Sequence, residues 1–184
     1  MSDQHVHVVA LQSAVLRAVD SAAGYIDGHV LRLNPHLWRK EDMRLVYDDH
    51  SKYAQLPWGS EWPVVNRFAM RHPGLGVDDV CVAYHGTKNT NRVMHILHEG
   101  YDPKYNKPGG SGFTSPDGAY FGVRADVAQK YGDVLLFIVL REHCGHKQIR
   151  GDGAFLAPAS STLPVGAYQR PSNYGFGDLF ERGR

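Results

Sequence analysis

The stretch VAYHGTKNTNRVMHILHEGYDP, residues 82–103, joins a short apolar run to a segment with helical periodicity. The apolar run, DVCVAY over residues 79–84, is continuous and rich in β-branched side chains, which is typical of a buried strand. A helix is predicted over residues 91–100, with Thr90 as its N-cap and Gly100 as its stop. The apolar side chains on one face of this helix are Val93, Ile96 and Leu97. The tripeptide His-Gly-Thr is therefore expected at the end of a strand that leads into a helix.

Two further strands and a short helix are predicted after this unit. AYFGV (residues 119–123) and VLLFIVLRE (134–142) have the composition of strands, and ADVAQKYG (125–132) between them is typical of a short helix. Residues 101–118 are rich in proline, glycine and lysine, and we expect a connection there. Beyond residue 142 glycine, proline and serine recur at short intervals, which predicts loops that join short strands.

The N-terminal part of the chain predicts helices and irregular segments. Residues 6–24 form an alanine-rich amphipathic pattern, and RLVYDDH (44–50) suggests a short strand. A second helix is expected from Ser60 or Glu61 to Met70, closed by His-Pro-Gly. Strands outnumber helices after residue 78, so we predict a mixed α+β class, with residues 1–77 as an extension packed on a core of residues 78–184.

The bulk composition is that of an ordinary globular protein. The chain has 184 residues, a formal net charge of +1, 42% hydrophobic and 21% charged residues. This balance requires neither a nucleic-acid nor a membrane partner. The longest apolar run, Val134 to Leu140, is too short to cross a bilayer, and the N-terminus lacks a signal-peptide pattern.

The two cysteines, Cys81 and Cys144, are too sparse to resemble a secreted disulfide scaffold. Cys81 lies inside an apolar run, where a small buried hydrophobic residue is the simplest interpretation. We therefore expect no disulfide and an intracellular location, cytoplasmic or nuclear.

Several side chains with chemical potential lie at the predicted strand and helix ends. A glycine such as Gly86 lets backbone approach a ligand closely, and His85 beside it can hydrogen-bond a hydroxyl group. Tyr120 and Tyr131 can supply aromatic faces for stacking. Together these are the groups that a pocket for NAD requires.

The order of these motifs resembles the catalytic domain of the poly(ADP-ribose) polymerase and diphtheria-toxin-like ADP-ribosyltransferases. That family is marked by a His-Tyr-Glu triad. The interval from His85 to Tyr120 is 120 − 85 = 35 residues and that from Tyr120 to Tyr131 is 131 − 120 = 11 residues, both similar to the polymerase branch. The motif Gly-x-Tyr-Phe is also similar to that branch. The motif YHGTK is similar to the toxin branch. The resemblance covers about residues 79–141.

The resemblance implies a role for each matching residue. His85 would hydrogen-bond the ribose next to adenine, and the Gly86 backbone would hold the nicotinamide amide. Thr87 would contact the adenosine side, Tyr120 would line the nicotinamide ribose, and Tyr131 would stack on the nicotinamide ring.

The resemblance also implies a fold of split mixed or antiparallel β-sheets with short flanking helices. Residues 101–118 would form a loop over the NAD site, where Asp102, Lys104 and Phe113 would approach the adenine half.

Two positions depart from the family pattern. Ala128 stands where the polymerase branch has a serine that helps hold the carboxamide, so a hydrogen bond of about 0.5–1.5 kcal/mol is lost and NAD binding is weakened. The acidic-aromatic run of the triad glutamate is missing, and Glu142 comes too early in the chain. Glu181 is the nominee for that role, and a non-acidic residue within 173–179 is the alternative.

The resemblance implies an NAD-dependent mono-ADP-ribosyltransferase that uses NAD as co-substrate, needs no metal and modifies a protein or nucleic acid. A departure at the glutamate is associated with mono-transfer or with a pseudoenzyme. Three alternatives stay open: an inactive module that binds NAD, ADP-ribose or a partner; an NAD glycohydrolase; and a scaffold domain that recruits another protein.

Other motifs do not suggest a site. His143-Cys144-x-His146 lacks a second pair of ligands for zinc, and His95 and His98 on the predicted helix are weak metal candidates. The Gly-Asp-Gly string at residues 151–153 lacks the strand–glycine–helix context of a Rossmann fingerprint.

Overall fold

A computed structural model describes residues 3–22, 26, 29–33, 53–55, 63–105, 118–145 and 153–169. The helices are α1 (Asp3–Ala22), α3 (Pro63–Arg71), α4 (Thr90–Glu99) and α5 (Ala125–Gln129). The strands are β1 (Val30–Leu33), β2 (Tyr53–Gln55), β3 (Val80–Thr87), β4 (Gly118–Gly122), β5 (Asp133–Leu140), β6 (Ala154–Pro158) and β7 (Thr162–Gln169). Within these ranges, no helix combines the length and apolar character needed to cross a membrane.

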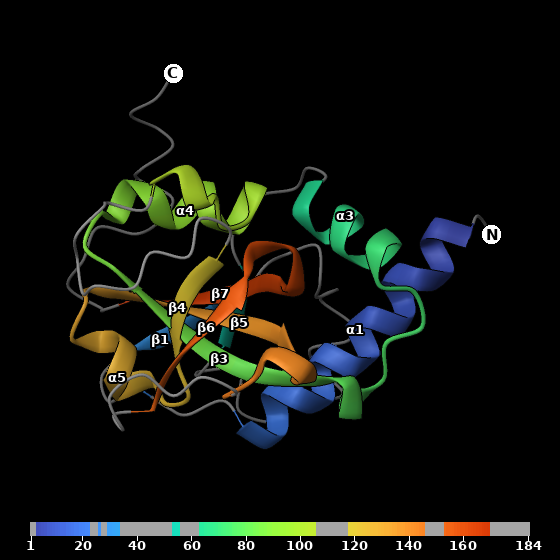
Figure 1. The fold of residues 1–184 in the computed structure, drawn as a ribbon, viewed down its shortest axis with the longest axis horizontal. Helices are drawn as coiled ribbons and strands as arrows, with labels where there is room; N and C mark the ends of the chain where they lie inside the picture. Colours follow the sequence, from blue (N-terminus) through green and yellow to red (C-terminus); the bar gives the residue numbers. More distant parts are fainter. Residues whose placement is uncertain are drawn as a thin grey trace.

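The seven strands form one sheet in the order β2-β1-β7-β5-β3-β4-β6. All neighbouring strands are antiparallel except β1 and β2, which are parallel. Helix α4 contacts β3, β5 and β7, and α5 contacts β3, β4 and β5 (Figure 1). The predicted α+β class is confirmed. The separate sheets expected from the family resemblance appear instead as one sheet whose β3–β4 junction is a single residue pair.

The central pair of strands explains the strongest pattern in the sequence. β3 and β5 pair along eight consecutive positions, from Val80 opposite Leu140 to Thr87 opposite Asp133. The β5 residues from Val134 to Leu140 are all buried. A strand that is covered on both faces buries its side chain at every position. Its apolar run is therefore continuous rather than alternating. β5 therefore lies in the middle of the sheet and of the core.

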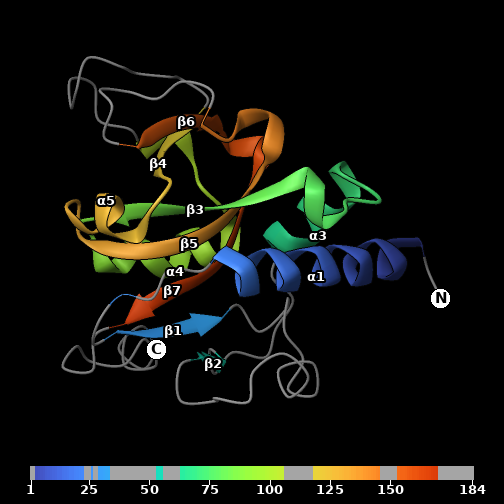
Figure 2. The ribbon, with the colours of Figure 1, turned by 90° about the horizontal axis from the view of Figure 1, so that it is seen from below.

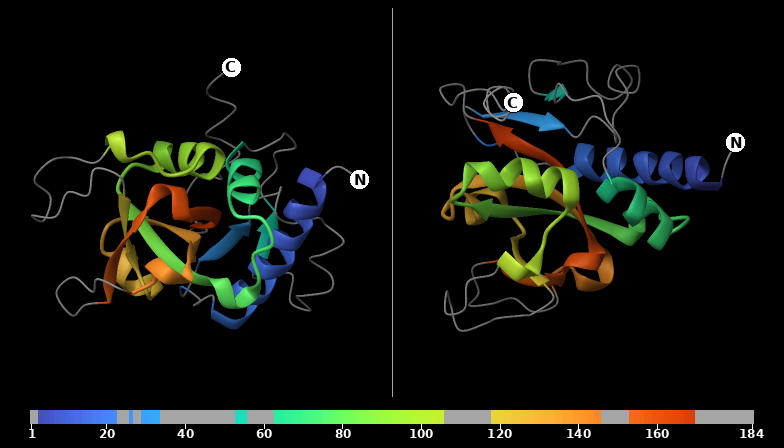
Figure 3. Two further views of the ribbon diagram at one scale, coloured as in Figure 1. Left: turned by 45° about the vertical axis from the view of Figure 1, so that its right-hand side comes forward. Right: turned by 90° about the horizontal axis from the view of Figure 1, so that it is seen from above.

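The N-terminal residues belong to the same hydrophobic core. β1 pairs antiparallel with β7, and α1 packs against α3 and β3 (Figures 2 and 3). The buried α1 side chains in the core are Leu11, Val15, Ala18 and Val19. The division of the chain at residue 77 stays a prediction, but elements from both sides of it share one core.

The helices begin and end close to where the sequence predicts. α1 and α4 confirm the helices expected over 6–24 and 91–100, although the α4 N-cap is Asn89, whose Oδ1 accepts a hydrogen bond from the Asn91 backbone N–H at 3.1 Å. The prediction of Thr90 as the cap is therefore wrong by one residue, because Thr90 already lies in the helix. The start expected at residue 60 or 61 and the strand expected over 44–50 lie outside the described residues.

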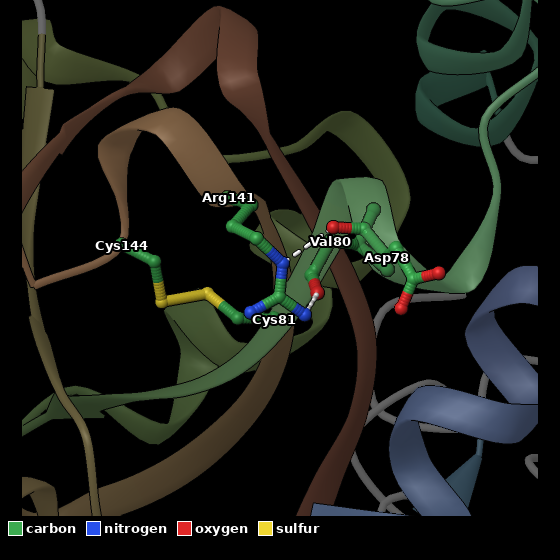
Figure 4. Close-up of a disulfide and its surroundings, with 5 residues drawn as sticks. All are labelled: Asp78, Val80, Cys81, Arg141 and Cys144. Atoms are coloured by element: carbon green, nitrogen blue, oxygen red, sulfur yellow. Dashed lines mark hydrogen bonds between the residues drawn. A yellow bond between two sulfur atoms is a disulfide. The ribbon is translucent and has the colours of Figure 1, made fainter.

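A disulfide joins Cys81 near the start of β3 to Cys144 just beyond β5, with their Cα atoms 6.6 Å apart. Figure 4 shows Arg141 beside it, with Nε donating to the Asp78 carbonyl and Nη2 donating to the Val80 carbonyl at 2.8 Å. The expectation of no disulfide is wrong, because the antiparallel pairing of β3 and β5 brings together two cysteines that are 63 residues apart. Such proximity is not visible in the sequence.

The disulfide is expected to stabilise the fold by about 4 kcal/mol, because it closes a long loop in the unfolded chain. We predict that the double variant Cys81→Ala, Cys144→Ala loses this amount of unfolding free energy in urea titrations under oxidising conditions. A reducing agent should shift the wild-type midpoint toward that of the variant and leave the variant unchanged. Equal midpoints for the oxidised wild type and the variant would contradict the prediction.

Candidate functional site

The candidate site lies where β3 and β4 part. β3 pairs with β5 along its whole length but with β4 at only one position, Tyr84 opposite Gly122. His85 and Gly86 follow Tyr84 on β3, and Tyr120 precedes Gly122 on β4. The residues that the sequence nominates therefore lie at the adjoining edges of two strands that stop pairing there.

The imidazole of His85 is oriented by the backbone of β4. Its Nδ1 lies 2.9 Å from the carbonyl oxygen of Tyr120. A carbonyl oxygen can only accept, so Nδ1 carries the proton and donates, and in the neutral ring Nε2 is left as an acceptor. Among the described residues, nothing hydrogen-bonds to Nε2. The ring can therefore accept a hydrogen bond from a ligand hydroxyl.

Burial keeps the His85 ring neutral. Desolvation lowers the pKa of His85 from its ordinary value of 6.5, and the hydrogen bond to the Tyr120 carbonyl opposes this shift. The ring packs near Tyr101, Phe121 and Phe137, with centroid distances of 5.1, 5.8 and 6.1 Å. Uncharged aromatic surroundings of this kind disfavour the imidazolium.

β3 approaches α5 so closely at Gly86 that no side chain fits. A Cβ on Gly86 would lie 2.1 Å from the carbonyl oxygen of Ala128 and 2.8 Å from the Cβ of Tyr131. The Tyr131 backbone N–H donates to that same carbonyl at 2.9 Å, which fixes the chain at the end of α5. Gly86, Ala128 and Tyr131 are therefore in direct contact, and this packing alone accounts for a glycine at position 86.

The nominated residues make separate contacts around the β3–β4 junction. Gly86 packs against α5, and the His85 ring lies beside Phe121 of β4. His85 and Tyr120 are linked through the Tyr120 backbone rather than ring to ring.

The two tyrosines have contrasting environments. The hydroxyl of Tyr120 is buried and has no hydrogen-bond partner within the described part of the chain. A buried hydroxyl without a partner costs about 1–3 kcal/mol, so such groups are uncommon in folded proteins. The side chain of Tyr131 is 54% exposed although its Cβ abuts the backbone at Gly86. Its ring is accessible for stacking.

The other nominated residues add little to the geometry of the candidate site. Thr87 is buried, and its Oγ1 accepts from the Asn89 backbone N–H at 3.4 Å. Asp102 and Lys104 form an ion pair, and the Lys104 backbone N–H donates to Asp102 Oδ1 at 3.1 Å. The residues that lie outside the described part of the chain are Phe113, Glu181 and residues 173–179. Their proposed roles stay predictions.

Sequence reasoning missed Tyr101 as a neighbour of His85. Its ring makes an edge-to-face contact with the imidazole at a centroid distance of 5.1 Å and an interplanar angle of 72°. The only signal in the sequence is its place directly after Gly100, the residue that ends α4. Nothing in the spacing connects it to β3.

The part of the chain that the structure describes contains no cluster of three or more His, Cys, Asp or Glu side chains arranged to hold a metal ion. Cys144 is bonded to Cys81, so the His-Cys-x-His string has no thiolate to offer. A reaction without metal remains a prediction.

Comparisons with known proteins add no identification: no family model matches the chain, and neither does a curated protein or a solved structure.

Gly86→Ala is expected to destabilise the protein by about 1–3 kcal/mol, because the new methyl group would overlap the Ala128 carbonyl oxygen. Gly76→Ala is the matched control, since its nearest atom, Asp79 Oδ2, would lie at an ordinary 3.4 Å and its φ is −97°. Thermal or urea unfolding measures both. A Gly86→Ala variant as stable as Gly76→Ala would show that α5 does not pack on β3 as described.

His85 should make stability depend on pH. As pH falls below 6.5, the unfolded chain binds a proton at this residue before the folded protein does, because burial lowers the folded pKa. The free energy of unfolding should therefore fall with decreasing pH, starting near pH 6.5. His85→Asn, whose amide can still donate to the Tyr120 carbonyl, should flatten this slope in urea titrations. Equal slopes for wild type and His85→Asn would contradict the prediction.

Proposed function

We propose that the protein is an NAD-dependent mono-ADP-ribosyltransferase with a fold of the ADP-ribosyltransferase type. One observation carries the proposal. Gly86 contacts Tyr131 just beyond α5, and Tyr120 lies on β4 beside the single residue pair at which β3 and β4 part. These are the three residues that the family resemblance assigns to the nicotinamide half of NAD.

The polar atoms at the site suit a dinucleotide. The buried Tyr120 hydroxyl has no partner among the described residues, and a polar group of a ligand would relieve the cost of that burial. His85 presents an unprotonated Nε2, which suits a ribose hydroxyl as donor. The exposed ring of Tyr131 suits a flat heterocycle. Both the hydrogen-bonding and the stacking groups fit NAD.

The residues would act by binding and orienting. Bound NAD supplies a nicotinamide group that leaves with the electron pair of its bond to ribose, while the acceptor bonds to that ribose carbon and releases a proton. Tyr131 and the backbone at Gly86 would hold the nicotinamide, and His85 would fix the ribose next to adenine. Such a site accelerates the reaction by positioning and by stabilising developing charge.

The third residue of the triad stays a prediction, with Glu181 as the nominee and a non-acidic residue within 173–179 as the alternative. β6 pairs with β4, and Leu156 lies opposite Tyr120. The β6 sequence, Ala-Phe-Leu-Ala-Pro, has no carboxylate. Glu181 and residues 173–179 lie outside the described part of the chain. A site without a carboxylate on the strand beside Tyr120 favours single transfer over chain growth.

The cellular compartment is part of the proposal. The intracellular location predicted from the sequence assumed free thiols, but the structure contains the Cys81–Cys144 bond. Structural disulfides persist mainly in oxidising compartments. We therefore favour action in an oxidising compartment. Thiol labelling of the protein isolated without reductant tests this: unlabelled cysteines support an oxidising compartment, and labelled cysteines support the reducing intracellular location.

The function is tested by incubating the protein with labelled NAD and with protein, RNA and DNA acceptors, scoring nicotinamide release beside label transfer. We expect wild type to release nicotinamide and to label a macromolecule, and His85→Ala or Tyr120→Ala to abolish release. His95→Ala, on the exposed face of α4, serves as the matched histidine control and should retain activity. Unchanged release from both site variants would refute the site assignment.

The same assay separates the alternatives. Free ADP-ribose without a labelled macromolecule would indicate a glycohydrolase, with water as acceptor. NAD binding without turnover would indicate an inactive binding module, and no NAD-dependent thermal shift would favour a scaffold domain. Glu181→Gln, compared with wild type in the same assay, tests whether that carboxylate contributes to transfer.

A further inference from the structure

Tyr101 is the closest aromatic neighbour of the His85 imidazole among the described residues. Its ring centroid lies 5.1 Å from that of His85, against 5.8 Å for Phe121 and 6.1 Å for Phe137. Phe121 and Phe137 are fully buried strand residues, whereas Tyr101 is half-buried and comes from the segment after α4. Tyr101 is thus the ring that covers His85 from outside the sheet.

The backbone on both sides holds Tyr101 in place. Gly100 ends α4 with a φ of +88°, and its N–H donates to the Ile96 carbonyl at 2.8 Å. A Cβ on Gly100 would lie 2.9 Å from Val64 Cγ2, so the end of α4 is packed against α3. On the other side, Asp102 accepts from the Lys104 backbone N–H at 3.1 Å and pairs with its ammonium group. Tyr101 therefore sits between two fixed turns.

The edge-to-face contact restricts the imidazole. With an interplanar angle of 72°, the Tyr101 and His85 rings have the arrangement that aromatic pairs favour. A ring flip of His85 would bring the carbon Cδ2 to the position of Nδ1 and break the hydrogen bond to the Tyr120 carbonyl. A packed aromatic neighbour makes that flip harder.

We propose that Tyr101 is a positioning residue that locks His85 in the Nδ1–H tautomer against the Tyr120 carbonyl, so that Nε2 remains the acceptor for a ribose hydroxyl. The locking of His85 stands on the geometry alone, and the role of Nε2 toward ribose rests on the proposed function. The part of Tyr101 that acts is its ring, because the contact with His85 is aromatic. Phenylalanine should therefore replace it, and alanine should not.

Among the described residues, the charges around the His85 ring do not supply another explanation for its tautomer. The groups of β4 and β5 that face His85 are the Tyr120 carbonyl and the rings of Phe121 and Phe137, all uncharged. On the segment that carries Tyr101, the charged groups Asp102 and Lys104 are paired with each other.

Long-range proton–nitrogen NMR spectra of protein with isotope-labelled histidine report the His85 tautomer directly. We expect wild type and Tyr101→Phe to show a single Nδ1–H tautomer, and Tyr101→Ala to show tautomers in exchange and a pKa of His85 closer to 6.5. Met70→Ala, an exposed residue on α3, should match wild type. A single Nδ1–H tautomer in folded Tyr101→Ala would overturn the proposal.

Activity provides the second readout. In the nicotinamide-release assay, Tyr101→Ala should lower kcat/KM by about tenfold, the value of one well-formed hydrogen bond, while Tyr101→Phe should remain within about twofold of wild type. Equal loss in both variants would show that the hydroxyl acts rather than the ring, and would overturn the proposal. If wild-type protein neither binds nor cleaves NAD, the proposed function fails, while the NMR result still decides the role of Tyr101.

Discussion

The pairing of β3 with β5 is the constraint on which the rest of the structure depends. Eight consecutive residue pairs join the two strands, and the side chains of β5 are buried on both faces of the sheet. β7 adds to the far edge of β5, and β1 adds to β7. The Cys81–Cys144 bond fastens the same two strands where β3 begins and the chain leaves β5. β3 is therefore held rigidly along one edge.

The other edge of β3 is almost unpaired, and the candidate site lies there. Because β4 meets β3 only at Tyr84 and Gly122, His85 can reach the Tyr120 carbonyl with its side chain, where a continuous ladder would have placed a backbone N–H. A functional site set beside a fully paired strand combines a rigid support with backbone groups that are not committed to the sheet. This arrangement gives His85 a defined orientation without enclosing it in a regular ladder.

The disulfide connects the stability of the fold to the site. Its 63-residue span contains every described residue assigned to NAD, from His85 to Tyr131. Closing that span restricts the unfolded chain while the antiparallel strands bring its ends together in the folded protein. The covalent bond and the β3–β5 ladder thus oppose separation of the same strands. The candidate site therefore lies within the segment that the disulfide closes.

The sequence by itself determined the local elements and nominated the residues of the candidate site. Periodicity located α1, α4 and β5, because amphipathic helices and buried strands leave a pattern in neighbouring residues. Motif and spacing nominated His85, Gly86, Tyr120 and Tyr131 for that site. Only the tertiary structure decided which of their atoms meet. The disulfide, the contact of Ala128 with Gly86 and the packing of Tyr101 on His85 join residues distant in the chain, and contacts of that kind depend on strand register and helix packing, which leave no local signal.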